Sequence, residues 1–143
     1  HMAAFTIGGL AYVGLGYGGT TNHPDFYHYD PNLNVWSSIA AFPAAARNRA
    51  FSFSIGGKGY IGAGIDLGVN QFDFFEYDNI LDSWTAIDDF PGTARNGGVA
   101  FTIGNTAYAG SGFDTGPRQD FYQLSNSDTS FYIVIHLVYW PSH

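Results

Sequence analysis

The sequence predicts an all-β protein made of three like units, each with four short strands. Residues 5–9 (Phe-Thr-Ile-Gly-Gly) return 48 positions later at 53–57 and return again at 101–105. Within each unit, short runs alternate apolar and polar residues between glycine- and asparagine-rich turns, which is the pattern of half-buried strands. A period near 50 residues built from short strands is typical of a stacked array of one supersecondary unit.

The three units are assigned to residues 3–49, 50–97 and 98–143. His1 and Met2 resemble the remnant of a cleaved expression tag and are left outside the fold. The third unit departs from the pattern towards its end. Its second loop is one residue shorter, Leu124 stands where the other units have tyrosine, and Phe131 stands where they have tryptophan.

The first strand of each unit has the clearest alternation, because Phe51, Phe53 and Ile55 point to one side while Ser52 and Ser54 point to the other. The predicted first strands cover residues 4–7, 51–55 and 99–103. A Gly-Gly or Gly-Asn pair follows each of them and supplies the positive φ that a two-residue hairpin turn requires.

The second strand of each unit carries alternating glycines, which are costly inside a strand unless another part of the protein must approach closely. We interpret them as a sign of close packing of one sheet on the next. The predicted second strands cover residues 11–15, 59–63 and 106–111. The glycines are Gly14, Gly16, Gly62, Gly64, Gly110 and Gly112.

Two further strands complete each unit after a longer polar loop. The third strands are predicted at residues 25–29, 73–77 and 120–124, and the fourth strands at 35–39, 83–87 and 130–135. The segment 30–34 (Asp-Pro-Asn-Leu-Asn) has strong turn chemistry between them. Aspartates open all three third strands (Asp25, Asp73 and Asp120), and a residue that repeats with the unit is interpreted as structural.

Composition excludes several classes of function. The chain has 5 basic and 12 acidic residues, a net charge of −7 and no basic run, so nucleic-acid binding is not expected. The absence of cysteine excludes disulfides, thiolate metal sites and cysteine nucleophiles. The longest apolar run, residues 131–140, is too short for a membrane-spanning helix of about 20 residues and is expected to form an outer strand.

Residues 53–62 (Phe-Ser-Ile-Gly-Gly-Lys-Gly-Tyr-Ile-Gly) and 73–78 (Asp-Phe-Phe-Glu-Tyr-Asp), with Trp84, resemble the kelch repeat, and in particular the tandem kelch repeats of exported bacterial proteins. The resemblance covers residues 3–124 well. It implies that each unit is a blade of a β-propeller, usually of six or seven blades, and it suggests an extracellular or periplasmic location. The glycines near the end of the second strand depart slightly from the commonest kelch spacing.

Three blades are too few for a ring, because propellers close with about 4–8 blades. We therefore predict a homodimer that forms one six-bladed propeller, in keeping with the prevalence of two-fold symmetry among homo-oligomers. Each joint would bury on the order of 800 Å² per side. A trimer or larger ring, and a fragment that needs other help to fold, remain alternatives.

The candidate site residues lie on loops that should share one rim of the ring, namely the loop after each second strand and the linker to the next unit. Arg47 and Arg95 occupy equivalent linker positions, and four of them in a dimer would hold an anionic or sugar ligand through forked hydrogen bonds. Alternatively, each caps a loop or pairs with Asp66 or Asp114. The further candidates, which lie outside the repeat pattern, are His23, Asp66, Asp114 and Arg118.

The function expected from this pattern is non-catalytic binding of a protein segment or a carbohydrate on the rim. The alternatives are a sugar-processing enzyme of the sialic acid mutarotase type, which the kelch resemblance allows, and a repeat fragment without a specific function. Acid–base catalysis would need carboxylates that meet across the ring, such as Asp66 and Asp114. No two histidines have metal-site spacing, so no metal or other cofactor is predicted.

Overall fold

The computed structural model describes residues 1–125 and 131–135. The regular secondary structure of these residues consists of β-strands. This described part contains no helix long and apolar enough to cross a membrane. Predicted and observed strands agree to within a residue or two at each end. The first sheet contains β1 (Ala3–Ile7), β2 (Leu10–Gly14), β3 (Phe26–Asp30) and β4 (Val35–Ile39); the second contains β5 (Phe51–Ile55), β6 (Lys58–Gly62), β9 (Phe74–Asp78) and β10 (Ser83–Ala86); the third contains β11 (Val99–Ile103), β12 (Thr106–Gly110), β13 (Phe121–Ser125) and β14 (Phe131–Ile135).

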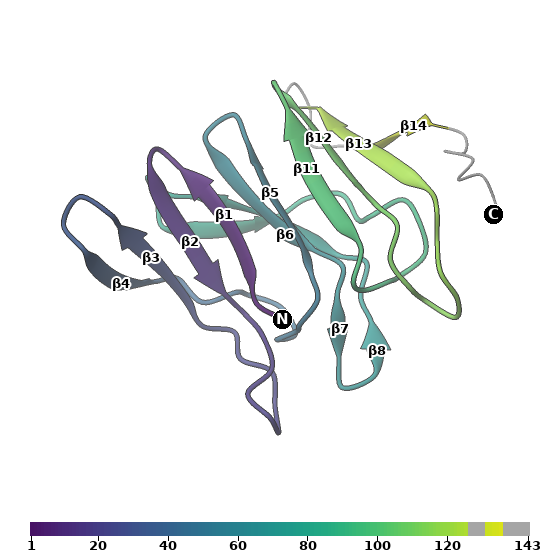
Figure 1. Cartoon of the computed structure of the whole chain (residues 1–143), viewed down its shortest axis with the longest axis horizontal. Helices are drawn as coiled ribbons and strands as arrows, with labels where there is room; N and C mark the ends of the chain where they lie inside the picture. Colours follow the sequence, from purple (N-terminus) through teal and green to yellow (C-terminus); the bar gives the residue numbers. More distant parts are fainter. Residues whose placement is uncertain (126–130, 136–143) are drawn as a thin grey trace.

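Each four-stranded sheet is an antiparallel meander whose strands pair in chain order. The three sheets stand side by side as propeller blades, with β1 next to β5 and β5 next to β11 (Figure 1). The predicted all-β fold of three four-stranded blades is therefore confirmed. Of the apolar run at residues 131–140, the first half forms β14 as expected, and residues 136–140 lie outside the described residues.

One strand pair was not predicted. Residues assigned to a loop of the second blade form a short hairpin of β7 (Ile65–Asp66) and β8 (Val69–Asn70). Its two turn residues, Leu67 and Gly68, have φ values of 45° and 89°. Positive φ at both positions is the geometry of a tight hairpin turn, and leucine is an unusual residue there.

The core lies between the blades and is largely aromatic. From the first blade, Phe5 and Phe26 contact the indole of Trp84 in the second, with ring centroids 6.3 and 5.1 Å apart. Phe5 also lies 6.2 Å from the ring of Tyr77. Each joint thus brings the apolar face of one blade against the opposite face of the next.

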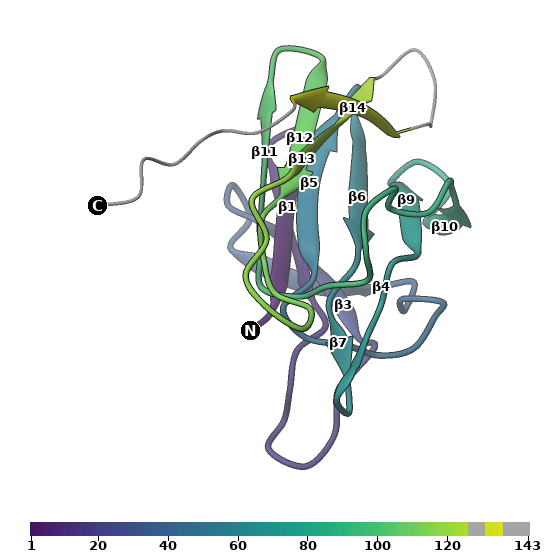
Figure 2. The same ribbon diagram turned by 90° about the vertical axis from the view of Figure 1, so that its right-hand side faces the viewer.

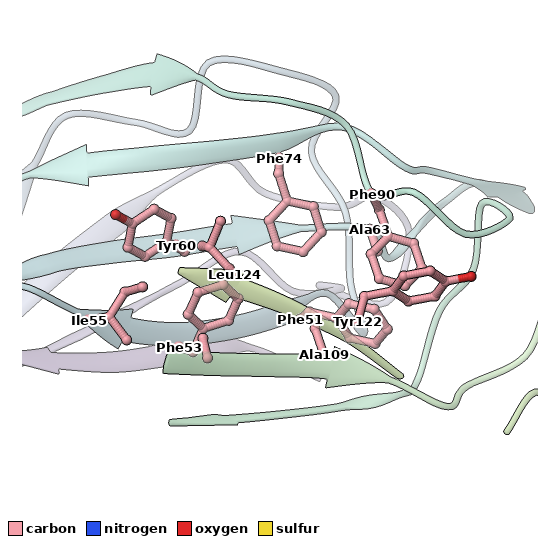
Figure 3. Packing of buried hydrophobic residues seen from close by; sticks show 11 residues of the cluster. Phe51, Phe53, Ile55, Tyr60, Ala63, Phe74, Phe90, Ala109, Tyr122 and Leu124 are labelled. Atoms are coloured by element: carbon pink, nitrogen blue, oxygen red, sulfur yellow. The ribbon is translucent and has the colours of Figure 1, made fainter. Parts of the chain in front are cut away.

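The same arrangement recurs between the second and third blades (Figure 3). Phe53 and Tyr60 stack with centroids 5.1 Å apart and belong to the same buried cluster as Tyr122 and Leu124 of the third blade. Because the two joints are built from equivalent positions, the packing repeats with the sequence.

Hydroxyl side chains on the innermost strands connect neighbouring blades. Ser52 Oγ donates to the carbonyl of Ala4 at 2.9 Å. One blade further on, Thr102 Oγ1 donates to the carbonyl of Ser54, also at 2.9 Å. The polar face of each first strand therefore joins the blades along the inner edge.

The alternating glycines pack differently from our interpretation. A Cβ at Gly62 would overlap the ring of Phe74, its pairing partner on the adjacent strand of the same blade, and Gly14 has the same relation to Phe26. The close approach at these positions is within a sheet. Sheet-on-sheet contact occurs instead at Gly59, where a Cβ would overlap the ring of Phe5 from the neighbouring blade.

The two end faces of the array are uncovered. On the third blade, Val99, Phe101 and Ile103 are 52%, 45% and 66% exposed, whereas the equivalent second-blade residues, which contact the third blade, are at most 5% exposed. On the first blade, the outward-facing Tyr27 and Trp36 are 44% and 58% exposed. Exposed apolar faces of this kind mark interaction surfaces.

Replacement of Gly62 by alanine should destabilise the protein by about 2 kcal/mol, because the Phe74 ring has to leave its position over the glycine. Gly116 provides a matched control, since a Cβ there would meet no atom within 4 Å. Gly116→Ala should change the free energy of unfolding by less than about 0.5 kcal/mol. Urea unfolding of both variants measures the difference, and equal effects would contradict the within-blade packing.

Candidate ligand-binding rim

The predicted rim loops lie at one end of the blades and bond to one another. The amide of Gly16, in the loop after β2, donates to the carbonyl of Arg47 at 3.0 Å. Asn48 and Ile65 exchange two backbone hydrogen bonds of 3.0 and 2.9 Å. In Figure 2 the loop after β2 and the β7–β8 hairpin project from the same end of the molecule.

Arg47 is completely buried in this rim, and all its guanidinium nitrogens have partners. It forms a bidentate ion pair with Asp73, in which the Nη2–Oδ2 distance is 3.1 Å. Its Nε donates to the carbonyl of Ala45 and its Nη1 to that of Ala63. The guanidinium also stands 5.0 Å from the centroid of the Phe42 ring.

Arg95 repeats this arrangement one blade later. It pairs with Asp120 through Nη1–Oδ1 and Nη2–Oδ2 distances of 2.5 and 2.9 Å and lies 4.9 Å from the Phe90 ring centroid. The hydrogen bond from Arg95 is the main cause that lowers the pKa of the Asp120 carboxyl. Both predicted site arginines thus form their ion pairs inside the protein. Their partners are Asp73 and Asp120 and not Asp66 or Asp114.

A chain of side-chain amides holds the neighbouring loops together. Asn48 Nδ2 donates to Asn22 Oδ1 at 2.8 Å, and Asn22 Nδ2 donates to Asp66 Oδ1 at 2.8 Å. The next blade has the equivalent pair, with Asn96 Nδ2 donating to Asn70 Oδ1 at 2.7 Å. These asparagines were not singled out from the sequence, although both pairs recur at the 48-residue period.

Asp114 and Arg118 form a compact loop in the third blade. Arg118 Nη2 lies 2.7 Å from Asp114 Oδ2, which also accepts a 2.6 Å hydrogen bond from Thr93 Oγ1. The hydrogen bonds from Arg118 and then Thr93 lower the pKa of Asp114, and the same pair raises the pKa of Arg118. Asp66 and Asp114 therefore have separate partners, and the structure shows no arrangement of the two as a catalytic pair.

His23 lies exposed on the loop after β2, with its imidazole over Gly18 and its amide donating to the Gly16 carbonyl at 3.0 Å. In the described part of the chain, no group of three or more histidine, aspartate or glutamate side chains is placed to hold a metal ion. The contacts of His23 are local to its loop.

The structure adds Arg49, which sequence reasoning passed over. It is exposed, has no acidic partner among the described residues, and adopts a left-handed φ of 55°. The next unit has Gly97 at the equivalent position, with a φ of 68°. An arginine in a conformation that favours glycine carries backbone strain, which is concentrated at functional sites in proteins. The sequence signal for Arg49 was that it stands where the next unit has a glycine.

Arg49 borders a pocket of about 440 Å³ between the first two blades. The pocket combines amide, aromatic, guanidinium and aliphatic groups on the rim. Its lining residues are His1, Tyr17, Asn22, Asn48, Arg49, Ile65, Leu67 and Gly68.

No family model matches the sequence, and no curated protein sequence matches it significantly. A solved structure described as "Structure of YjhT" matches over 97% of this chain with a TM-score of 0.79 and 17% sequence identity. The chain spans about half of that protein, 52% of its length. At this identity the similarity establishes the fold, which is an array of β-propeller blades, and leaves the activity to be inferred from the residues.

The importance of the buried ion pair can be tested at equivalent aspartates. Asp73→Ala should destabilise the protein by about 3 kcal/mol, because it leaves the Arg47 charge buried without its partner. Asp25 opens the third strand of the first blade at the same repeat position but is exposed and has no arginine partner among the described residues. Asp25→Ala should therefore cost less than about 0.5 kcal/mol.

Chemical denaturation of the two variants gives both numbers. A loss at Asp73 no larger than that at Asp25 would show that the paired arginine does not depend on its carboxylate.

Proposed function

We propose that the chain is a kelch-type binding module whose rim pocket takes a carbohydrate. The observation that carries this proposal is Arg49, an exposed guanidinium without an acidic partner among the described residues, held in left-handed backbone at the edge of the pocket. Structural arginines of the same rim, such as Arg47, are buried and paired. The contrast marks Arg49 as available to a ligand.

The surrounding groups suit a sugar. Asn22 and Asn48 line the same pocket as Arg49 and supply amide groups, and Tyr17, which is 54% exposed, supplies an aromatic ring. A few convergent polar groups next to an apolar surface are the usual make-up of small-molecule sites. A guanidinium adds forked hydrogen bonds to vicinal hydroxyls or a carboxylate.

The alternative function is a sugar-processing enzyme of the mutarotase type. Such chemistry needs a general acid or base within reach of the bound sugar. The described residues that line the pocket include no carboxylate. The histidine among them is His1, which belongs to the predicted tag remnant, and the Tyr17 hydroxyl donates to the Gly19 carbonyl. Nearby Asp66 accepts a hydrogen bond from Asn22. These contacts favour binding over catalysis.

We further propose that two copies close a six-bladed ring. At each internal joint, one face of a blade packs on the opposite face of the next blade. The exposed face of Val99, Phe101 and Ile103 on the third blade is equivalent to the first kind of face, and the outward face of the first blade is equivalent to the second kind. This chain matches 52% of the other protein's length, so the remaining length of that protein is enough for about three more blades. A second copy would supply that half here.

The rim proposal predicts that Arg49→Gly weakens ligand binding while it keeps or raises the melting temperature, because glycine relieves the left-handed strain. Binding to an array of neutral and carboxylated glycans should fall at least about tenfold. Lys58→Gln removes the same charge far from the pocket, in the ion pair with Asp78, and should leave binding unchanged. A parent protein that retains no glycan, or an Arg49→Gly variant that binds like the parent, would refute the rim site.

The ring proposal predicts a solution mass of twice the 15.5 kDa chain mass at micromolar concentration. Phe101→Asp places a charge at the centre of the proposed joint and should give a monomer. Ile80→Asp is the matched control, because Ile80 is 87% exposed on the turn between β9 and β10, away from the end faces. Light scattering measures the masses of the parent and of both variants. A monomeric parent would contradict the two-copy ring.

A further inference from the structure

The linkers between blades share a sequence, Phe-Pro-x-x-x-Arg, that we call the strap: residues 42–47 (Phe-Pro-Ala-Ala-Ala-Arg) and 90–95 (Phe-Pro-Gly-Thr-Ala-Arg). Each strap fastens itself to the blade that follows it by its arginine and its phenylalanine. The two contacts are repeated with nearly the same geometry at both joints, so they define a recognition mode rather than a single contact.

The first strap shows the mode in detail. Its Arg47 forms the bidentate pair with Asp73, and its Phe42 ring meets the rings of Phe75 and Trp84 edge-on, with centroids 5.1 and 5.4 Å apart. Just before the strap, the carbonyl of Ala40 accepts a 2.9 Å hydrogen bond from Trp84 Nε1. A carboxylate, an aromatic ring and an indole thus receive the strap.

The second strap uses the same positions of the third blade. Arg95 pairs with Asp120, and the Phe90 ring meets Tyr122 edge-on at 4.9 Å between centroids. The carboxylate and the ring are again supplied by the start of the third strand of the blade.

The first blade has all three receiving groups and no strap among the described residues. By the repeat, Asp25 corresponds to Asp73, Tyr27 to Phe75, and Trp36 to Trp84. The Asp25 carboxylate is exposed and forms no hydrogen bond or ion pair with a described side chain. Tyr27 and Trp36 are 44% and 58% exposed. Among the described residues, the ring of Trp36 contacts that of Tyr29 in its own sheet, with centroids 4.9 Å apart.

We propose that this surface of Asp25, Tyr27 and Trp36 docks an extended Phe-Pro-x-x-x-Arg segment of a partner polypeptide. The guanidinium pairs with Asp25, and the phenylalanine packs against Tyr27 and Trp36. A second copy of this chain is not the source, because both of its straps are already seated on its own Asp73 and Asp120. The net charge of −7 favours approach of a basic segment.

Docking of the strap is compatible with the closed ring and independent of the rim pocket. At both internal joints the strap and the neighbouring blade cover the same sheet together, as Phe42 and Phe26 do on Trp84. A partner segment can therefore occupy the first blade whether or not a second copy completes the ring.

The test is a calorimetric titration of the full chain with the peptide Ala-Phe-Pro-Ala-Ala-Ala-Arg-Asn-Arg-Ala, a copy of residues 41–50. Saturable binding is expected, with the dissociation constant raised at least about tenfold by Asp25→Asn. Replacement of the first arginine of the peptide by glutamine should have the same effect. The two changes combined should weaken binding no further than either alone, because both remove one contact.

Asp89→Asn is the matched control, since Asp89 is an exposed aspartate away from the proposed surface, and its variant should bind the peptide like the parent. Because Asp25 is exposed, its variant is expected to keep the parent melting temperature, which a thermal scan verifies. No saturable binding at millimolar peptide would overturn the proposal. Equal binding by the parent and Asp25→Asn, or additive effects of the two changes, would overturn it as well.

Discussion

The architecture depends on one ion pair that is made twice, Arg47 with Asp73 and Arg95 with Asp120. Apolar contacts between facing sheets are not directional, and the first linker, residues 40–50, is mostly alanine. A buried, bidentate guanidinium has fixed geometry, so it sets where each linker crosses the end of the next blade. Because the rim loops bond to those linkers, the same pair positions the pocket around Arg49.

Most of the fold follows from the sequence because each blade obeys local rules. Alternation in residues 51–55 identifies a strand and its buried face, and the Gly-Gly turn fixes the pairing that follows. The β7–β8 hairpin could not be predicted, since Leu67 at positive φ runs against its own preference. The role of Gly62 was also misjudged, because the ring of Phe74 reaches it from the adjacent strand of the same sheet.

The candidate site was less predictable, for a physical reason. The repeat identifies Arg47 and Asp73 as important but does not say that they meet. Two hairpins, β5–β6 and β7–β8, separate them along the chain, and only the fold brings them together. Arg49 carried a readable signal, the replacement of the glycine found at 97. Its meaning emerges only when the backbone is known to be left-handed there and the guanidinium is known to lack an acidic partner in the described structure.

The two ends of the three-blade array have different requirements. The third blade presents Val99, Phe101 and Ile103, which need only an apolar sheet to cover them. The first blade presents aromatic rings together with the Asp25 carboxylate, and a carboxylate is not satisfied by apolar contact. A ring closed by identical chains matches the apolar faces to each other but brings no free strap arginine to Asp25, since each copy uses its own. Self-association would therefore cover the apolar faces at the two ends, whereas segment docking would pair the Asp25 carboxylate of the first blade.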